Sequence, residues 1–184
     1  MKGLDRHLQK RRIEAALPWI RSGAHVLDVG CADGALFRLG RAQIASGVGI
    51  DIRPTDSWAG EGFERRVGTF PETVGAGERF DAVVMLAVVE HVPADELSRW
   101  GAAVPDLLRA DGRLVVTTPS PVVDHILHAG IRLRVLDGME ADEHHGFDPR
   151  DVPGIFSRPG LRLERRSRFE LGLNHLFVFA ATPA

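Results

Sequence analysis

The chain has 184 residues, a length that fits one ordinary domain and can bury a core without a metal or a disulfide. Its 44% hydrophobic and 26% charged residues are ordinary for a globular protein, and a single cysteine excludes an internal disulfide and a cysteine-rich zinc site. The formal net charge of −2 gives no overall reason to expect nucleic acid. No apolar run is long enough for a membrane span and no signal peptide is evident, so the sequence predicts a cytoplasmic protein.

The first two thirds of the chain alternate short apolar runs with amphipathic segments, which is typical of an α/β fold with a parallel sheet. The predicted strands are residues 24–29, 47–52, 63–70, 80–86 and 113–118, and the predicted helices are residues 5–21, 35–45 and 93–108. The pattern changes after Pro119. A short helix over 122–129, a helical segment over 148–157 and two strands over 161–169 and 175–181 follow, the last two joined by a hairpin turn.

The most informative segment reads Val26-Leu-Asp-Val-Gly-Cys-Ala-Asp-Gly-Ala-Leu36. A buried strand ends at Gly30, and a tight turn leads into a helix whose first N–H groups have no partner in the helix. This arrangement binds a polar or anionic ligand at the carboxyl edge of a parallel sheet. Asp51 ends the second predicted strand, where a carboxylate can accept hydrogen bonds from both hydroxyls of a ribose.

The charges around this turn discriminate between two classes of cofactor. A dinucleotide needs Gly-x-Gly-x-x-Gly, whereas here Gly30 and Gly34 flank Ala32, and the third glycine is missing. The carboxylates of Asp28 and Asp33 would repel a pyrophosphate but attract the sulfonium and ammonium groups of S-adenosylmethionine. The sequence therefore favours the methyl donor, with an NAD-dependent oxidoreductase as the weaker alternative.

The segment resembles motif I of the class I S-adenosylmethionine-dependent methyltransferases, in the group typified by ubiquinone and menaquinone methyltransferases. Further matches in register are Gly49-Ile-Asp-Ile52, Arg79-Phe-Asp-Ala-Val-Val-Met-Leu86, Val89-Glu-His-Val92 and the run from Leu107 to Pro119. The resemblance covers residues 24–119. It implies a Rossmann-like, doubly wound, seven-stranded sheet that is mostly parallel with a C-terminal antiparallel hairpin strand. It also implies one methyltransferase domain over residues 1–184, with an N-terminal helix over 1–22 and a substrate lid over 119–157.

The resemblance implies a set of residues around S-adenosylmethionine. They are Asp28, Gly30, Cys31, Ala32, Gly34, Asp51, Ile52, Thr69, Phe70, Leu86 and Ala87. Asp51 would bind the ribose and Ile52 would lie against the adenine. Ala32 stands where the family often has glycine, which implies an adjusted turn, and Thr69 stands where many relatives carry aspartate. Three purely structural alternatives remain: Cys31 is a small buried residue, Phe70 is a core residue, or Asp33 is a helix cap.

Histidines are the candidates for removing a proton from the acceptor, since the chain has no tyrosine. His91 follows the fourth predicted strand, and His144 and His145 lie in the lid; each can instead be a packing or solvated residue. A related group of O-methyltransferases uses Glu-x-x-Glu-His to support a metal, but Ala87 replaces the first glutamate here. His125 and His128 share a helix face without a clear third ligand, so we expect no metal.

The expected function is methyl transfer from S-adenosylmethionine to a small molecule, or to a biosynthetic intermediate presented by a carrier or a lipid, at oxygen. The alternatives are a protein of this fold that binds without turnover and the oxidoreductase. Nucleic acid is not expected as a partner, because Leu86 to Glu90 offer no aromatic residue that could stack on a flipped base. The sequence is compatible with a homodimer. Four arginines over residues 162–168 are expected on a solvated sheet edge.

Overall fold

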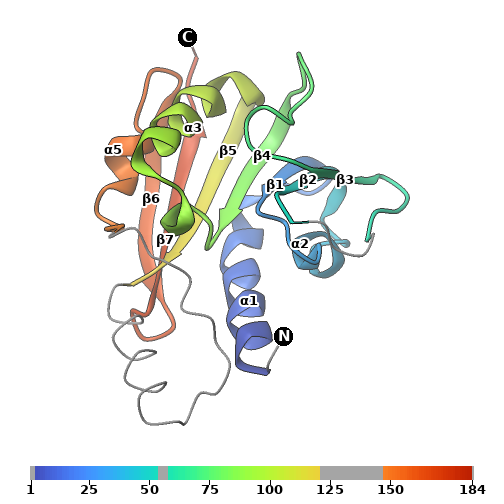
Figure 1. Cartoon of the computed structure of the whole chain (residues 1–184), viewed down its shortest axis with the longest axis horizontal. Helices are drawn as coiled ribbons and strands as arrows, with labels where there is room; N and C mark the ends of the chain where they lie inside the picture. Colours follow the sequence, from blue (N-terminus) through green and yellow to red (C-terminus); the bar gives the residue numbers. More distant parts are fainter. Residues whose placement is uncertain (1–2, 54–57, 121–146, 184) are drawn as a thin grey trace.

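The computed structural model describes residues 3–53, 58–120 and 147–183 (Figure 1). Its strands are β1 Ala24–Val29, β2 Ile44–Asp51, β3 Phe63–Val67, β4 Phe80–Leu86, β5 Leu108–Pro119, β6 Leu161–Phe169 and β7 Asn174–Ala181. Its helices are α1 Gly3–Ala16, α2 Ala35–Leu39, α3 Ala94–Leu107 and α5 Val152–Phe156, with short 3-10 turns η1 Leu17–Trp19 and η2 Val89–His91. The helix expected over 122–129 and most of the expected lid over 119–157 lie outside the described residues.

The strands form one seven-stranded sheet in the order β3-β2-β1-β4-β5-β7-β6. Neighbours from β3 to β5 pair in parallel, and β7 runs antiparallel to both β5 and β6. The predicted α/β class, the mostly parallel sheet and the closing hairpin are therefore confirmed. Strand β6 lies at the edge of the sheet, so the four arginines of residues 162–168 do belong to an edge strand, as expected.

Each face of the sheet is covered by its own apolar core. On one face, Leu97, Trp100 and Val104 of α3 pack with α5 against β4, β5 and β7. On the other face, α1 and α2 cover β1, β2 and β4. The central strands are buried on both faces, which explains why their sequences are continuous apolar runs. None of the helices in the described ranges is long and apolar enough to cross a bilayer.

Two helices end earlier than the sequence predicts. The N-terminal helix, expected over residues 5–21, stops at Ala16, because Pro18 lacks an N–H and disfavours a helical residue before it. The side chain of Gln43 then hydrogen-bonds to the carbonyl oxygen of Leu17 at 2.7 Å. Helix α2, expected over 35–45, ends at Leu39 with Gly40 as its C-cap.

Strand β5 is longer than expected. It begins at Leu108 rather than at 113 and passes through an irregularity at Asp111, whose φ is +62°, so the Asp111-Gly112 pair bends the strand without ending it. Strand β3, in contrast, ends at Val67 rather than at 70. Thr69 and Phe70 therefore lie in the connection that follows β3.

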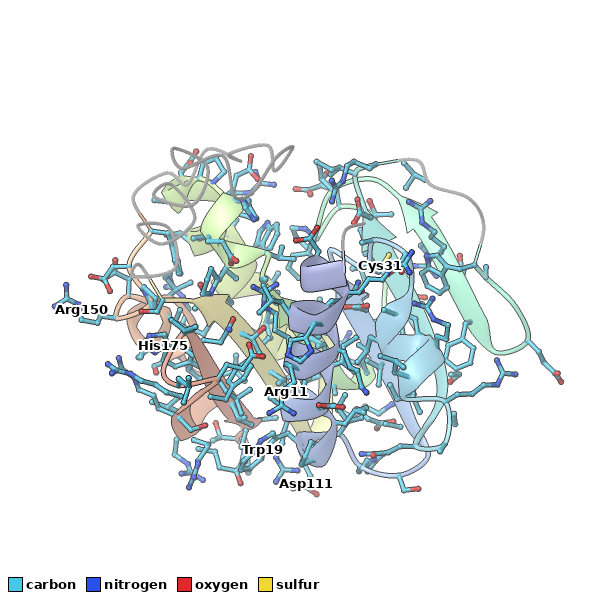
Figure 2. All side chains as sticks on the ribbon, turned by 90° about the horizontal axis from the view of Figure 1, so that it is seen from below. Arg11, Trp19, Cys31, Asp111, Arg150 and His175 are labelled. Atoms are coloured by element: carbon cyan, nitrogen blue, oxygen red, sulfur yellow. The ribbon has the colours of Figure 1, made fainter. Side chains whose placement is uncertain are left out.

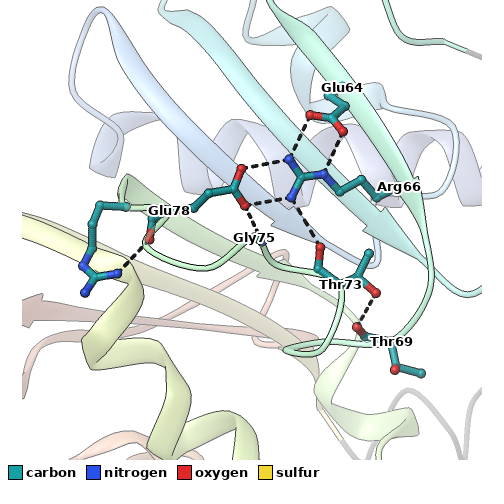
Figure 3. A network of polar contacts seen from close by, with 7 residues as sticks. Glu64, Arg66, Thr69, Thr73, Gly75 and Glu78 are labelled. Atoms are coloured by element: carbon teal, nitrogen blue, oxygen red, sulfur yellow. Dashed lines mark hydrogen bonds and ion pairs between the residues drawn. The ribbon is translucent and has the colours of Figure 1, made fainter.

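A network of polar contacts centred on Arg66 orders the β3–β4 connection (Figure 3). The guanidinium of Arg66 hydrogen-bonds to both oxygens of Glu78, at 2.7 and 2.8 Å, and to both oxygens of Glu64, at 2.8 and 2.9 Å. It also donates to the carbonyl oxygen of Thr73, whose hydroxyl donates to the carbonyl oxygen of Thr69 at 2.7 Å. The network thus fixes the path of the chain just after β3, beside the carboxyl edge of the sheet.

Replacing Arg66 with methionine is expected to lower the free energy of unfolding by about 1 to 2 kcal/mol at neutral pH, because two bidentate pairs are lost while the aliphatic stem remains. Hydrogen bonds from Arg66 lower the pKa values of Glu78 and Glu64 from the ordinary 4.5. This stabilisation is fully present above that ordinary value and is lost as pH falls through the lowered values. Urea unfolding at neutral and acidic pH should show the difference from wild type shrinking in acid.

Arg79→Met is the matched control, since Arg79 is an exposed neighbour that donates only to the carbonyl oxygen of Glu78. It removes the same formal charge and should stay within about 0.5 kcal/mol of wild type. Equal urea midpoints for the Arg66 and Arg79 variants would show that the Arg66 network does not stabilise the fold.

Candidate cofactor and acceptor site

The predicted cofactor residues are brought to one edge of the sheet by the strand register. Val29 of β1 pairs with Ile50 of β2 on one side and with Met85 of β4 on the other. The residues that directly follow these three, Gly30, Asp51 and Leu86, therefore lie side by side at the carboxyl ends of neighbouring parallel strands. This is the edge at which open α/β sheets bind their ligands.

The turn after β1 depends on its two glycines. Gly30 and Gly34 have φ values of +76° and +67°, a region that side-chain-bearing residues rarely adopt. A Cβ on Gly30 would lie 2.2 Å from Cγ2 of Val88, and one on Gly34 would lie 2.4 Å from the Trp58 ring. The backbone N–H groups of Gly30 and Cys31 donate to the carbonyl oxygen of Ile50, which ties the turn to β2.

Two alanines at this edge also have left-handed backbone conformations. Ala32, in the turn after β1, has a φ of +42°, and Ala87, directly after β4, has a φ of +55°. Such strain in residues other than glycine tends to cluster at functional sites. The turn therefore accommodates Ala32, where the family often has glycine, by placing an alanine in a glycine-like conformation.

Asp51 is buried at the end of β2, with 6% of its surface exposed. One carboxylate oxygen accepts the backbone N–H of Ala32 at 2.9 Å, and the other accepts that of Arg53 at 2.9 Å. Each oxygen keeps further acceptor capacity, because a carboxylate has about four lone-pair positions. Asp51 thus fixes the turn after β1 and can still accept hydrogen bonds from a ligand.

Burial makes the charged forms of two other turn residues unfavourable. Burial raises the pKa of Asp28 well above its ordinary range, and the neighbouring charges of Asp51 and Asp33 raise it further. Burial and the same kind of neighbours raise the pKa of the Cys31 thiol to about 12. The Cys31 side chain, 4% exposed, is therefore a protonated core residue and not a nucleophile.

Asp33 connects the turn to the helices beside it. Its carboxylate accepts hydrogen bonds from Gln9 of α1 at 2.9 Å and from Arg38 of α2 at 3.1 Å. Burial alone would raise the pKa of Asp33, but these two hydrogen bonds outweigh it and lower the pKa. The N-cap of α2 is Gly34, which makes no side-chain capping bond.

The ends of β2 and β3 expose apolar side chains next to the buried Asp51. Ile52 is 68% exposed, and Val67, the register partner of Asp51 on β3, is 55% exposed. The sequence predicts Ile52 as a cofactor-binding residue but gives no signal for Val67, because its position opposite Asp51 depends on strand register. Thr69 is exposed, whereas the Phe70 ring is buried and packs edge-on against Trp100 at 5.2 Å, as in the core alternative for this residue.

The end of β4 carries the one predicted catalytic histidine that lies in the described part of the chain. Leu86 pairs with Thr117 of β5, and the N–H of Ala87 donates to the Thr117 carbonyl oxygen at 2.9 Å. His91 closes η2 just beyond and is exposed. His144 and His145, together with His125 and His128, lie outside the described residues. Within the described ranges, no three His, Cys, Asp or Glu residues are grouped so as to hold a metal ion.

The sequence does not predict a polar cluster that joins α1 to the β6–β7 hairpin. Arg12 of α1 donates to the side-chain oxygen of Asn174 at 3.1 Å, and Asn174 donates to Glu170 at 2.9 Å. Burial lowers the pKa of Arg12, and the nearby carboxylate of Glu90 opposes that effect. Only helical periodicity could have indicated that Arg12 faces inward, next to the core residue Ile13. The contact joins α1 to the start of β7.

Comparison with known proteins gives a family model and two kinds of relatives. The model described as "Methyltransferase domain" matches residues 2–165. A ubiquinone biosynthesis O-methyltransferase from Cereibacter sphaeroides is 34% identical over 116 residues, which cover 59% of this chain and 45% of the relative. A second ubiquinone biosynthesis O-methyltransferase, from Dinoroseobacter shibae, is 34% identical over 151 residues, which cover 76% of this chain and 60% of the relative. The chain thus spans about half the length of these curated relatives.

Solved structures of methyltransferases have the same fold. The 1,6-didemethyltoxoflavin N1-methyltransferase of Burkholderia thailandensis, with bound S-adenosylhomocysteine, aligns with a TM-score of 0.73 and 19% identity over 98% of this chain and 83% of that chain. The magnesium protoporphyrin IX methyltransferase of Synechocystis, also with bound S-adenosylhomocysteine, aligns with a TM-score of 0.69 and 17% identity over 96% and 85%. At these identities the likeness establishes the architecture of the sheet and its covering helices.

Proposed function

The chain belongs to the class I S-adenosylmethionine-dependent methyltransferases, and on that premise we propose that it transfers a methyl group from S-adenosylmethionine to a hydroxyl of a small acceptor. The acceptor is a free biosynthetic intermediate or one presented by a carrier or a lipid. The observation that carries the proposal is the buried Asp51 carboxylate beside a turn that admits no side chain at Gly30 or Gly34.

The residues at the carboxyl edge fit the chemistry of this cofactor. Asp51 has acceptor capacity for the ribose hydroxyls, and Ile52 and Val67 supply exposed apolar surface for the adenine. The carboxylate of Asp33 favours the positive charges of the methionine part, whereas burial disfavours the charged form of Asp28. The Phe70 ring is occupied by its contact with Trp100, so its backbone, with that of Thr69, would border the adenine.

When bound, the cofactor supplies a methyl group made electrophilic by the sulfonium. The protein then has to align the acceptor oxygen with the methyl carbon and to accept the hydroxyl proton. His91 is the proposed proton acceptor, because it follows β4 at the edge where Leu86 and Ala87 would meet the methionine part. His144 and His145 stay as predictions for contacts to the acceptor. The choice of oxygen is supported by the relatives, which are named O-methyltransferases.

Calorimetry with the purified chain tests the cofactor. S-adenosylmethionine and S-adenosylhomocysteine should bind in the micromolar range, and NADH should produce no binding heat, because its pyrophosphate would meet the carboxylate of Asp33. Binding of NADH alone would overturn the proposal in favour of the oxidoreductase.

Release of S-adenosylhomocysteine in the presence of small phenols tests turnover. Catechol should support release and 1,2-dimethoxybenzene should not, because only catechol has a hydroxyl to methylate. Cofactor binding without release from any of a panel of hydroxyl, amine and carbon acceptors would instead favour a protein of this fold that binds without turnover.

A further inference from the structure

A pair of buried polar side chains lies opposite each other at the carboxyl end of β5. Thr118 of β5 and His175 of β7 are direct partners in the antiparallel register. They are 0% and 4% exposed. The Thr118 hydroxyl and the His175 Nδ1 atom have no hydrogen-bond partner in the described part of the chain, and they do not bond to each other.

Two unpaired polar atoms in one cross-strand pair need a physical reason. Buried hydroxyls and ring nitrogens are almost always hydrogen-bonded in native proteins, because burying them unpaired is unfavourable. Directly opposite residues on antiparallel strands have Cβ atoms roughly 5 Å apart, so one small group can reach both side chains at once. A single hydroxyl placed between the two side chains would therefore satisfy both unpaired atoms.

The pair lies on the face of the sheet that α3 and α5 cover. Val116 and Phe177, two positions before Thr118 and two after His175, belong to the core under α3. The His175 ring is nearly parallel to that of Phe177, at a centroid distance of 6.1 Å and an interplanar angle of 9°. The stacking fixes the imidazole plane. Phe147 packs against the same core, and the charge of the next residue, Asp148, acts on His175.

The position of the pair suits an acceptor and not the cofactor itself. Leu86 of β4 pairs with Thr117, so Thr118 stands at the level where β4 ends. With β5 between β4 and β7 and strands about 4.8 Å apart, His175 lies roughly 10 Å along the edge from the end of β4. Figure 2 labels His175 and Cys31, a residue of the cofactor turn, on opposite sides of α1. A hydroxyl held between Thr118 and His175 would lie roughly 7 Å along the edge from the end of β4, so an acceptor with hydroxyls at opposite ends of a ring could reach both the pair and the end of β4.

The charges around His175 keep its ring neutral. Burial lowers its pKa, and the positive charges of Arg168 and Arg166 on β6 lower it further. Asp148 opposes this, but its carboxylate is also hydrogen-bonded by Arg150, at 2.6 and 2.8 Å. A neutral imidazole nitrogen and a threonine hydroxyl both match a hydroxyl group, which donates one hydrogen bond and accepts others.

We propose that Thr118 and His175 bind a phenol-type hydroxyl of the methyl acceptor between the threonine oxygen and the imidazole Nδ1. The inference deepens the proposed function and rests on it. In an acceptor with two hydroxyls, this pair would hold one of them while the other is presented at the end of β4. The pair would thereby select acceptors with a second hydroxyl over those with a methyl or a hydrogen at that position.

Isosteric variants test the proposal, with hydroquinone, whose hydroxyls lie at opposite ends of the ring, as the acceptor probe and release of S-adenosylhomocysteine as the readout. Thr118→Val should raise the KM for hydroquinone at least about tenfold and leave cofactor affinity unchanged. His175→Phe, which keeps the stacked ring, should do the same. Thr117→Val is the matched control: its hydroxyl is equally buried and unpaired, but it lies on the other face of the sheet. It should leave both values unchanged.

Urea unfolding supplies a readout that does not depend on turnover. Because the Thr118 hydroxyl stabilises nothing in the free chain, Thr118→Val should leave the urea midpoint unchanged or raise it. A lower midpoint with an unchanged KM would overturn the proposal and make the hydroxyl structural. Cofactor binding without any turnover of hydroquinone would overturn it too, while leaving the cofactor part of the proposed function intact. Failure to bind S-adenosylmethionine would overturn the proposed function and the inference together.

Discussion

Replacing Asp51 with asparagine is expected to weaken binding of S-adenosylhomocysteine by about 10- to 100-fold, since hydrogen bonds to a charged partner are each worth about 1.5 to 3 kcal/mol. Asparagine keeps the shape of the side chain but replaces one acceptor oxygen by an NH₂ group. In the native chain both oxygens accept backbone N–H groups, those of Ala32 and Arg53. The variant therefore also brings two donors together and should lose about 1 to 2 kcal/mol of stability.

The two effects can be separated by measuring affinity calorimetrically at a temperature where circular dichroism shows the variant folded. Glu61→Gln is the matched control, because Glu61 is an exposed carboxylate in the connection between β2 and β3. It removes the same formal charge at the opposite end of the β2–β3 pair and should not change affinity. A folded Asp51→Asn chain with wild-type affinity would show that the end of β2 does not bind the ribose.

The sequence predicts the sheet well because its signals are local. Strands β1 and β4 are buried on both faces, so each reads as a continuous apolar run. The turn at Gly30 follows from the need for a left-handed backbone directly after a strand. The sequence predicts helix ends less accurately, because Pro18 and Gly40 end α1 and α2 in the middle of patterns that remain apolar-periodic.

The parts of the site that the sequence could not predict all depend on contacts between distant segments. Val67 lies beside Asp51 only because β2 and β3 pair in one particular register. Thr118 and His175 meet through the antiparallel pairing of β5 with β7, and neither belongs to a motif. Position in the family motif therefore predicts His91 and gives no signal for His175, the buried histidine on β7.

Gly30→Ala is expected to lower the free energy of unfolding by about 2 to 5 kcal/mol and to abolish tight cofactor binding. Two costs add. A left-handed φ costs an alanine about 1 to 2 kcal/mol, and overpacking a well-packed contact costs about 1 to 3 kcal/mol. The added Cβ would stand 2.2 Å from Cγ2 of Val88, so one of the two segments must move. Thermal unfolding monitored by circular dichroism, with calorimetry of S-adenosylhomocysteine, measures both effects.

The chain contains a control that isolates the backbone cost. Gly23 has a φ of +74°, close to that of Gly30, but a Cβ there would meet nothing within 4 Å. Gly23→Ala should therefore lose only the conformational part and leave cofactor affinity unchanged. Adding Val88→Ala to Gly30→Ala should recover the steric part and leave the backbone cost, which makes the double variant more stable than the two single changes would predict. Equal losses in the free energy of unfolding for Gly23→Ala and Gly30→Ala would show that a Cβ at position 30 does not clash with Val88. The tight contact between the segments that follow β1 and β4 would then be absent.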